Sequence, residues 1–330
     1  MPKAHRPQDA LTSLSVEWLR ILENEIRDTL HSEVSLLSEV PNYLLKLGGK
    51  RIRPALTFML AQLCNQNTLT DDLLNIANGI ELIHMATLLH DDIIDEAATR
   101  RGKESALSKF GLSYTLLAGN FLFVRAFGRC ARLPSFIIKS TEKVCVLLTE
   151  GEIIEDEGIY RCEHALNIAT RKTGALFGLA ALAGIFVPTQ DESLSQLGYS
   201  FGNDLGVAFQ ISDDILDVTS TEKELGKTPG TDIKERKPSL VNSLWYESKS
   251  QLARKILNSS DVITTLEISE ALAEIENSGV IETTRNVGIE YVEKAKSTLN
   301  EICMQLNEDF DPNIRQKIEL LTDYALDRLS

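Results

Sequence analysis

The feature that most constrains the fold is the spacing of apolar residues, which recur at helical intervals along nearly the whole chain. The pattern is clearest in stretches that begin at Val16, Leu73, Val144, Ile289 and Ile314. Such spacing gives one face of an α-helix apolar side chains, whereas half-buried strands show strict alternation. No alternating stretch is accompanied by hairpin turn signals. The sequence therefore predicts an all-α fold, and because no composition shift marks a boundary, residues 1–330 are predicted to form one domain.

An acidic pentapeptide occurs twice, each time at the end of an apolar helical stretch. The copies, DDIID and DDILD, supply Asp91, Asp92, Asp95, Asp213, Asp214 and Asp217. Residues three and four apart share a helix face, so each copy forms one acidic patch. Like charges this close need a counter-charge, and Mg²⁺ prefers such oxygen ligands. One copy alone would more often be a solvated helix face, but two copies predict two metal-binding patches that clamp one diphosphate.

Composition excludes several classes of protein. The 330 residues carry a net charge of −14, so a nucleic-acid-binding surface is not expected. The cysteines are scattered without a CxxC pair, which favours neither a disulfide nor a zinc site. The N-terminus lacks the apolar segment of a secretory signal, although a removed organellar transit peptide stays open. The longest uncharged apolar run, Gly174–Pro188, is too short for a transmembrane segment, so a cytoplasmic protein is predicted.

Two segments interrupt the helical pattern. Gly48–Pro54 (GGKRIRP) is a glycine turn that leads into a helix, where backbone N–H groups and three cations could hold an anion. Gly226–Pro238 (GKTPGTDIKERKP) is a long polar loop directly after the second acidic motif. Loops of this length without structure of their own often act as lids. The first segment is therefore a candidate anion site and the second a candidate lid.

Some basic residues stand where a bound phosphate would need them. Lys50 and Arg53 are predicted to share one helix face, although as isolated residues they would be surface cations. Arg100 and Arg101 follow the first acidic motif. Paired guanidinium groups suit phosphate oxygens, but an exposed arginine pair is more often a solvated helix end. These residues therefore become informative only in combination.

Three further residues carry the same ambiguity. His84 is predicted to lie on the side of the helix that carries Asp91, although a lone histidine on an apolar helix is more often a satisfied core residue. Lys172 and Thr173 separate a polar stretch from a wholly apolar one, which by itself indicates a helix start capped by the threonine.

Taken in order, these features are Gly48–Pro54, Asp91–Gly102, Lys172–Thr173, Phe209–Asp217, Gly226–Asp232 and Lys237. Motifs in this order resemble the trans-isoprenyl (polyprenyl) diphosphate synthase family, and the resemblance covers essentially the whole chain. It implies a helix bundle around a central apolar cavity, two or three Mg²⁺ ions per active site, and a homodimer. It also implies a prenyltransferase that condenses isopentenyl diphosphate onto an allylic diphosphate.

The resemblance assigns roles to individual residues. The six aspartates would hold Mg²⁺ on the allylic diphosphate. The cations that would contact the same diphosphate are Arg100, Lys172, Lys227 and Lys237. The residues that would bind isopentenyl diphosphate are Lys50, Arg53, His84 and Arg101. Thr173 and Gln210 would direct oxygen dipoles at the developing allylic cation, and the departing diphosphate would remove the final proton.

The chemistry explains these residue types. Breaking the allylic C–O bond releases a diphosphate, so metal ions and cations that neutralise this leaving group lower the barrier. The resulting carbocation must meet only the alkene of isopentenyl diphosphate, which requires a dry apolar pocket. A protein nucleophile is not needed.

Product length is predicted from the helix that leads into Asp91. Thr87 and Ala86 lie about 6–7.5 Å below the motif, where a growing tail would pass. Members of the resembled family with short products commonly carry an aromatic residue here, so small side chains predict an open shaft and a long chain of about C30–C50. Such a product would be a precursor of a quinone side chain. A larger side chain deeper down would set the floor, either Leu82 or Met85, or an aromatic residue on a neighbouring helix such as Phe121, Phe123 or Phe127.

The chain departs from the family pattern at Glu104, Asn120 and Arg236, and the charge of Arg236 in the lid puts lid motion or affinity in question. Three alternatives stay open at this point. A synthase of geranylgeranyl or farnesylgeranyl diphosphate would make a shorter product. A terpene cyclase shares one acidic motif, but the second copy and the cations speak against it. A regulatory subunit of a hetero-oligomeric synthase would keep the fold, although such subunits usually lose aspartates.

Overall fold

The protein is built almost entirely of helices, as the spacing of its apolar residues predicts. The computed structural model describes residues 13–220, 229–307 and 310–327. The helices are α1 (Ser13–Thr29), α2 (Ser35–Lys46), α3 (Ile52–Leu63), α4 (Asp71–Ile94), α5 (Ala106–Phe110), α6 (Leu112–Cys130), α7 (Ser135–Asp156), α8 (Cys162–Ala169), the π-helical turn η2 (Thr170–Gly174), α9 (Ala175–Thr189), α10 (Glu192–Thr219), α12 (Thr231–Lys234), α13 (Leu240–Glu247), α14 (Gln251–Leu257), α15 (Thr265–Asn277), α16 (Val280–Gln305) and α17 (Pro312–Asp327). The predicted all-α fold is confirmed.

A short hairpin follows the first acidic motif. Its strands, β1 (Thr99–Arg100) and β2 (Lys103–Glu104), pair antiparallel, with Thr99 opposite Glu104. Arg101 occupies the turn at φ 53°, in the left-handed region. No hairpin was expected from the sequence, because two-residue strands leave no alternating pattern to detect.

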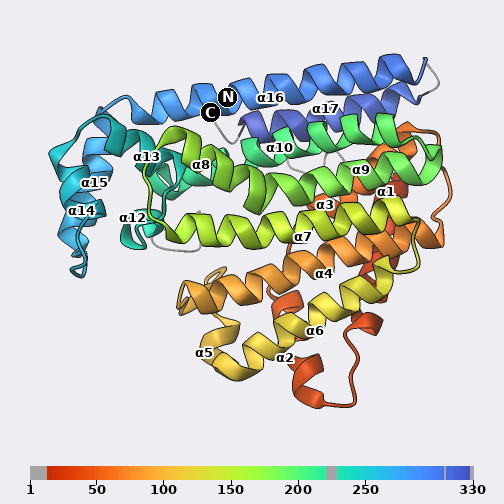
Figure 1. The fold of residues 1–330 in the computed structure, drawn as a ribbon, viewed down its shortest axis with the longest axis horizontal. Helices are drawn as coiled ribbons and strands as arrows, with labels where there is room; N and C mark the ends of the chain where they lie inside the picture. The colour runs from red at the N-terminus through yellow and green to blue at the C-terminus, as the bar shows by residue number, and fades with distance from the viewer. Residues whose placement is uncertain (1–12, 221–228, 308–309, 328–330) are drawn as a thin grey trace.

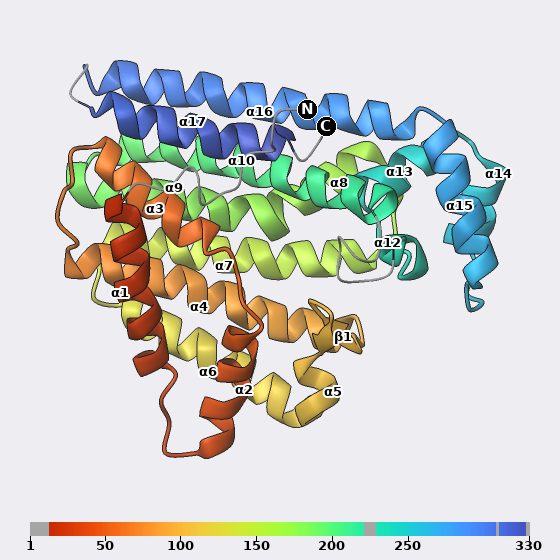
Figure 2. The ribbon, with the colours of Figure 1, turned by 180° about the vertical axis from the view of Figure 1, so that it is seen from behind.

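The long helices lie side by side in stacked layers. Figure 1 shows α16 and α17 along one edge, α10, α9 and α7 next to them, and α4 and α6 toward the opposite edge. α10 packs along α9 and α16, and α4 packs along α6. Seen from behind, α1 and α3 cover the other face of the bundle (Figure 2). The two acidic motifs end α4 and α10, so these long helices deliver both patches to one end of the bundle.

The centre of the bundle is α9, whose residues from Ala175 to Phe186 are all buried. A helix that is apolar on every side must be covered on every side. α10 and α3 supply most of that cover. The packing is close, because a Cβ added at Gly184 would lie 2.5 Å from the carbonyl oxygen of Thr57 on α3.

α8, η2 and α9 form one helical run, Cys162–Thr189, which by length and composition alone could cross a membrane. Most of its apolar part, 72%, is buried inside the protein. The segment therefore packs as the core helix that the apolar run Gly174–Pro188 predicts, although the helix is longer than that run.

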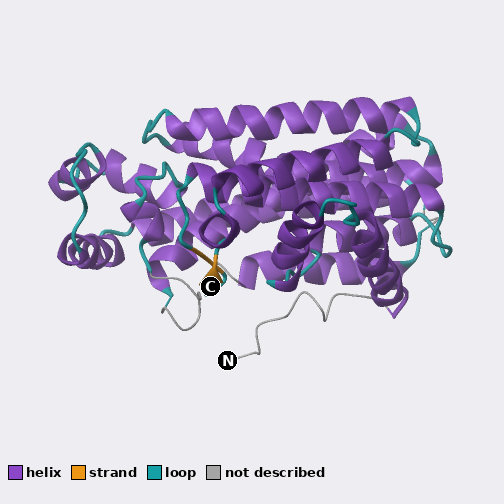
Figure 3. Ribbon diagram, turned by 90° about the horizontal axis from the view of Figure 1, so that it is seen from below, coloured by secondary structure: helices purple, strands orange, loops and turns teal. Residues whose placement is uncertain are grey.

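A smaller group of helices, α12 to α15, stands at one end of the bundle (Figures 1 and 3). Its apolar side chains, Trp245 among them, form a second apolar cluster together with residues of α8, α10 and α16. Trp245 is fully buried, and its Nε1 donates a hydrogen bond to Glu274 at 3.0 Å, so the polar atom of the indole is satisfied. The first helix of this group, α12, lies within the predicted lid Gly226–Pro238, so this part of the lid is helical, whereas a loop without structure of its own was predicted.

Candidate active site

One cavity of about 770 Å³ lies where the ends of α4 and α10 meet η2 and the start of α3. The predicted residues that line it are Lys50, Arg53, His84, Thr87, Asp91, Arg101, Lys172, Thr173, Gln210, Asp213, Asp214 and Lys237. The predicted residues that lie outside its lining are Ala86, Asp92, Asp95, Arg100 and Asp217. Lys227 falls outside the described residues. The structure therefore brings segments that are far apart in the sequence together around one cavity.

The first acidic motif is balanced by cations. Arg100 donates from Nε to Oδ1 of the buried Asp92 at 2.6 Å. Lys237 donates to Asp95 at 2.7 Å. Burial raises the pKa of Asp91 to about 7, although Lys172 acts in the opposite direction. Arg100, predicted to contact the diphosphate, is thus placed against the motif itself.

Among the described residues, two aspartates of the second acidic motif accept hydrogen bonds from neutral donors. Asp214 accepts from the side-chain amide of Gln210 at 2.9 Å and from the backbone N–H of Leu240 at 2.8 Å. Asp217 accepts from the backbone N–H of Asp232 at 3.0 Å. Burial raises the pKa of Asp214 to about 7, and the two hydrogen bonds only partly offset it. Asp213 is exposed and lines the cavity.

Lys172 and Thr173 lie on η2, a π-helical turn inside a continuous helix. The predicted helix start with a threonine cap is therefore wrong at this position. π-turns are frequent at functional sites, because the extra residue redirects side chains. Here Thr173 donates from Oγ1 to Oε1 of Gln210 at 2.7 Å. Gln210 in turn donates from Nε2 to Oδ1 of Asp214. This chain of hydrogen bonds fixes the orientation of the Gln210 amide.

Two glutamates that sequence reasoning missed hold Lys172. Its Nζ lies 2.6 Å from both Glu152 and Glu155 on α7. Burial lowers the pKa of Lys172, but these carboxylates outweigh it and the net pKa is raised. Glu155 also lines the cavity. In the sequence Glu152 and Glu155 are ordinary acidic residues of a helix. Only the packing of α7 on η2 shows that they lie beside Lys172.

The other half of the cavity is rich in cations. Lys50, Arg53 and Arg101 line it together with His84. Burial lowers the pKa of Arg53 to about 10, which leaves it charged at neutral pH. Burial, and then the nearby Arg53 and Arg101, lower the pKa of His84 well below its usual value. His84 is therefore a neutral hydrogen-bonding group among cations.

Arg51, one of the three cations of Gly48–Pro54 that were predicted to hold an anion, is paired with carboxylates instead and fixes the turn that carries the other two. Its φ is 50°, a left-handed conformation that disfavours side chains. Arg51 is held there by Glu23 at 2.7 Å and by the buried Glu81 at 2.6 Å. The turn is tight, since a Cβ added at Gly49 would lie 2.6 Å from the guanidinium group of Arg51. Glu81 lies three residues before His84, so the sequence alone could have placed its carboxylate on the same face of the helix as His84.

The described part of the lid is anchored at Arg236. This residue has φ 53°, a conformation that glycine adopts more readily. Its guanidinium donates to the backbone carbonyls of Ile256 and Asp261, and its own carbonyl accepts from Tyr160 at 2.7 Å. Arg236 does not line the cavity. The off-pattern charge therefore ties the lid to α14 rather than entering the site.

Oxygen ligands for a metal are present on both sides of the cavity. Asp91 comes from α4, and Asp213 and Asp214 come from α10. Oδ2 of the adjacent Asp92 is buried without a hydrogen-bond partner in the described part of the chain. Among the described residues, no group of three acidic, histidine or cysteine side chains could hold a metal by itself. This donor set fits Mg²⁺, which keeps waters and takes further ligands from substrate phosphates.

Known proteins share this sequence pattern and fold. The profile of the family described as polyprenyl synthetase matches residues 34–275. The chain is 31% identical over 337 residues to the all-trans-nonaprenyl-diphosphate synthase (geranyl-diphosphate specific) of Rhodobacter capsulatus, with 98% of each chain covered. It is 33% identical over 288 residues to heptaprenyl diphosphate synthase component 2 of Bacillus subtilis, with 85% of this chain and 81% of that one covered. The crystal structure of a polyprenyl synthase from Caulobacter crescentus, complexed with calcium and isoprenyl diphosphate, matches with a TM-score of 0.88 at 29% identity, with 100% of both chains covered.

A helical bundle with two acidic patches at one cavity, together with these matches, defines a prenyltransferase. The chain belongs to the polyprenyl synthetase family. The predictions of family, fold and long-chain trans-polyprenyl diphosphate synthase activity are thereby confirmed. The roles of the individual site residues stay predictions.

Proposed function

We propose that the cavity binds an allylic diphosphate between the two acidic motifs and isopentenyl diphosphate among Lys50, Arg53, His84 and Arg101. The observation that carries this division is the cavity's charge pattern. The carboxylates of the two motifs come from the ends of α4 and α10, whereas the cations at the GGK turn and the β1–β2 hairpin are Lys50, Arg51, Arg53 and Arg101, of which Arg51 is paired with Glu81. Each half suits one diphosphate, the first through bridging Mg²⁺ and the second through direct cation contacts.

Two or three Mg²⁺ ions would bind at Asp91, Asp213 and Asp214, and would supply positive charge to the leaving diphosphate. Lys172 and Lys237 add charge on the same side. Both are paired with carboxylates in this structure, so a diphosphate that binds here exchanges one anionic partner for another. Thr173 and Gln210, linked by their hydrogen bond, stand on the cavity wall with oxygens that can face a developing cation.

The product would be a long chain of about C30–C50, which serves as a precursor of a quinone side chain, because small residues line the start of its path. Thr87 lines the cavity, where its Oγ1 donates to the carbonyl of His84 at 2.9 Å. Ala86 is fully buried and lies outside the lining. Thr87 is therefore the better candidate for the wall of the shaft, and Met85, which also lines the cavity, is a candidate for its floor.

Substituting these two positions tests the shaft. Thr87→Phe places a ring in the cavity about one helical turn below Asp91, so the product should shorten by several isoprene units while the first condensation persists. Ala86→Phe is expected to overpack the core and to lower the melting temperature instead. Sizing of the labelled products of both variants checks this, and an unchanged product from an active Thr87→Phe protein would remove Thr87 from the shaft.

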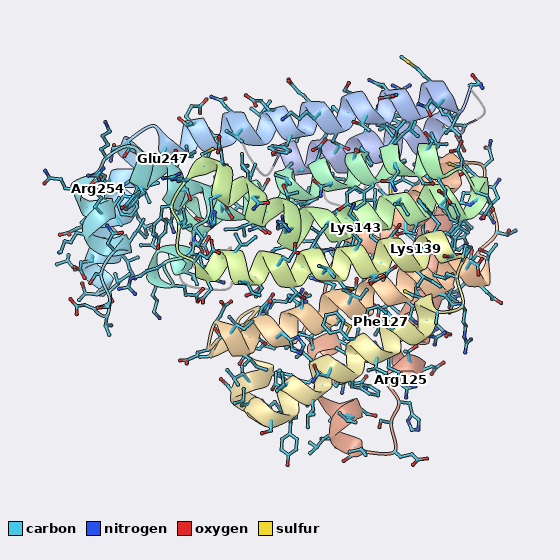
Figure 4. The ribbon with its side chains drawn as sticks, viewed as in Figure 1. Arg125, Phe127, Lys139, Lys143, Glu247 and Arg254 are labelled. Carbon is cyan, nitrogen blue, oxygen red and sulfur yellow. The ribbon has the colours of Figure 1, made fainter. Side chains whose placement is uncertain are left out.

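The partner of the chain would be a second copy. Exposed apolar side chains gather on α6 at Leu112, Tyr114, Leu116, Leu117, Val124 and Phe127. Phe127 is labelled on α6 in Figure 4. Large exposed apolar patches mark protein interfaces, and Leu117 and Val124 have the spacing of a helix–helix seam. The similarity to a protein named component 2 makes a different subunit the alternative partner. Light scattering on the pure protein would separate a dimer from a monomer. The dimer would work in the cytoplasm.

One incubation tests the proposed function. The pure protein is given farnesyl diphosphate, labelled isopentenyl diphosphate and Mg²⁺, and the extracted products are sized. The proposal predicts products of about C30–C50 that form only with the metal, because the leaving group must be neutralised. A product that stops at geranylgeranyl or farnesylgeranyl length would favour the shorter synthase. An inactive pure protein would favour a subunit that needs a different partner.

A further inference from the structure

The last helix of the described chain reaches the cation-rich half of the cavity. Lys50 donates from Nζ to the hydroxyl oxygen of Tyr324 on α17 at 2.7 Å, across 274 positions of sequence. The same ammonium group lies 5.3 Å from the centroid of the Tyr324 ring. Tyr324 is 9% exposed, so the ring is buried while its hydroxyl meets the cation. No sequence motif pointed to this residue.

Tyr324 is also one end of a row of aromatic rings. Its ring centroid lies 5.9 Å from that of Phe209, and Phe209 stacks on Phe177 at 5.3 Å. The guanidinium group of Arg53 lies over Phe177 at 4.7 Å. Phe177 and Phe209 line the cavity. Lys50 and Arg53, two of the three cations of Gly48–Pro54, are therefore held at opposite ends of one aromatic row.

The residues on either side of Tyr324 fix its position. The carbonyl of Ala325 accepts from Oγ of the buried Ser212 on α10 at 3.0 Å. Asp323 pairs with Lys296 on α16 at 2.5 Å. α17 is thus attached to both neighbouring helices at the level of the tyrosine, and the hydroxyl has a defined place.

We propose that Tyr324 is a positioning residue that holds Lys50 ready for the diphosphate of isopentenyl diphosphate, so that α17 sets affinity in this half of the cavity. The inference rests on the proposed function. A lysine has three N–H donors, and the tyrosine takes one of them and leaves two for phosphate oxygens. Lysine is among the side chains that lose most rotamer freedom when they are ordered, so ordering it before binding lowers the cost of binding.

Tyr324→Phe tests the proposal, because it removes only the hydroxyl. The KM for isopentenyl diphosphate is expected to rise about threefold to tenfold, while kcat and the KM for the allylic substrate stay within about twofold. Tyr291→Phe on α16 is the matched control, since the lysine over its ring, Lys294 at 4.5 Å, does not line the cavity, whereas Lys50 does. The melting temperature of each variant is measured alongside.

A double-mutant cycle separates positioning from packing. In a Lys50→Ala background, Tyr324→Phe should add no further increase in KM, because the group it positions is gone. A packing defect would instead raise KM in both backgrounds, and that result would overturn the proposal even if the variant were less stable. An unchanged KM in Tyr324→Phe, or equal rises for both substrates, would also overturn it. An inactive wild-type protein would refute the proposed function instead.

Discussion

The two acidic motifs have the same spacing but different surroundings. In the first, Asp92 and Asp95 are paired with Arg100 and Lys237. In the second, Asp214 and Asp217 accept hydrogen bonds from neutral groups, two of which are backbone N–H groups in residues 232–240. In the described part of the chain, charged groups therefore contact Asp92 and Asp95 of the first patch, and neutral dipoles contact Asp214 and Asp217 of the second. A repeated motif thus determines the positions of the carboxylates, and the surrounding fold determines which groups contact them.

One segment touches both motifs. Lys237 pairs with Asp95, and the N–H groups of Asp232 and Leu240 bind the second motif. Residues 232–240, the end of the predicted lid and the start of α13, therefore bridge the two acidic motifs. We expect the contacts of this segment to respond when a diphosphate and Mg²⁺ fill the space between the motifs.

The largest effect is expected from removing one carboxylate from either wall. Asp91→Ala and Asp213→Ala should each lower kcat by about 10³-fold or more, because each helps to stabilise charge that develops as the diphosphate leaves. Asp71→Ala, at the exposed first turn of α4, is the control and should keep full activity. Product formation at saturating Mg²⁺ is the measurement. Near-normal turnover in either cavity variant would mean that only one motif is used.

A smaller effect is expected from cutting the segment's contact to one motif at a time. Lys237→Met removes the charge beside Asp95, and Leu240→Pro removes the N–H that Asp214 accepts. Leu240 is the first residue of α13, where proline is tolerated, and Leu240→Ala controls for the lost side chain. Each cut should raise the KM for the allylic substrate about tenfold, since one charge-assisted hydrogen bond is lost. If Leu240→Pro matched Leu240→Ala, the backbone contact would have no part in binding.

The smallest effect concerns stability without metal. Burial raises the pKa of Asp214 to about 7 in the folded protein, above its unfolded value. Between these two pKa values the folded state binds more protons, so stability falls as pH rises from about 4 to about 7 and stays low above that. Asp214→Asn should therefore raise the melting temperature at pH 8 by about 2 °C or more, and by less at pH 5. A lower melting temperature for the variant at pH 8 would contradict this.

The sequence was enough to predict the helical class and both acidic patches, because each depends on spacing within one helix. α4 and α10 end at the predicted motifs, and Asp91 and Asp213 line one cavity. The role of Arg100 was harder to anticipate, because its partner Asp92 was itself assigned to the metal.

Contacts between distant segments could not be predicted. Glu155 meets Lys172 only because α7 packs against η2, and Tyr324 meets Lys50 only because α17 docks between its neighbours. Ala86 illustrates the limit within a helix. Position along α4 gave its depth below Asp91, but only the packing showed that it faces the core while Thr87 faces the cavity.

The binding of inorganic diphosphate, measured by calorimetry with and without Mg²⁺, tests whether the two motifs act on one diphosphate. If both motifs hold one diphosphate through shared metal, the wild type should bind tightly only with Mg²⁺, and Asp91→Asn and Asp213→Asn should each lose that gain. The double variant should bind no more weakly than either single variant, because losing either carboxylate already removes the joint binding of the diphosphate by both motifs. The two patches would work separately if the losses of binding free energy in the two single variants added up in the double variant. Mg²⁺-dependent binding that survives in either single variant would show the same.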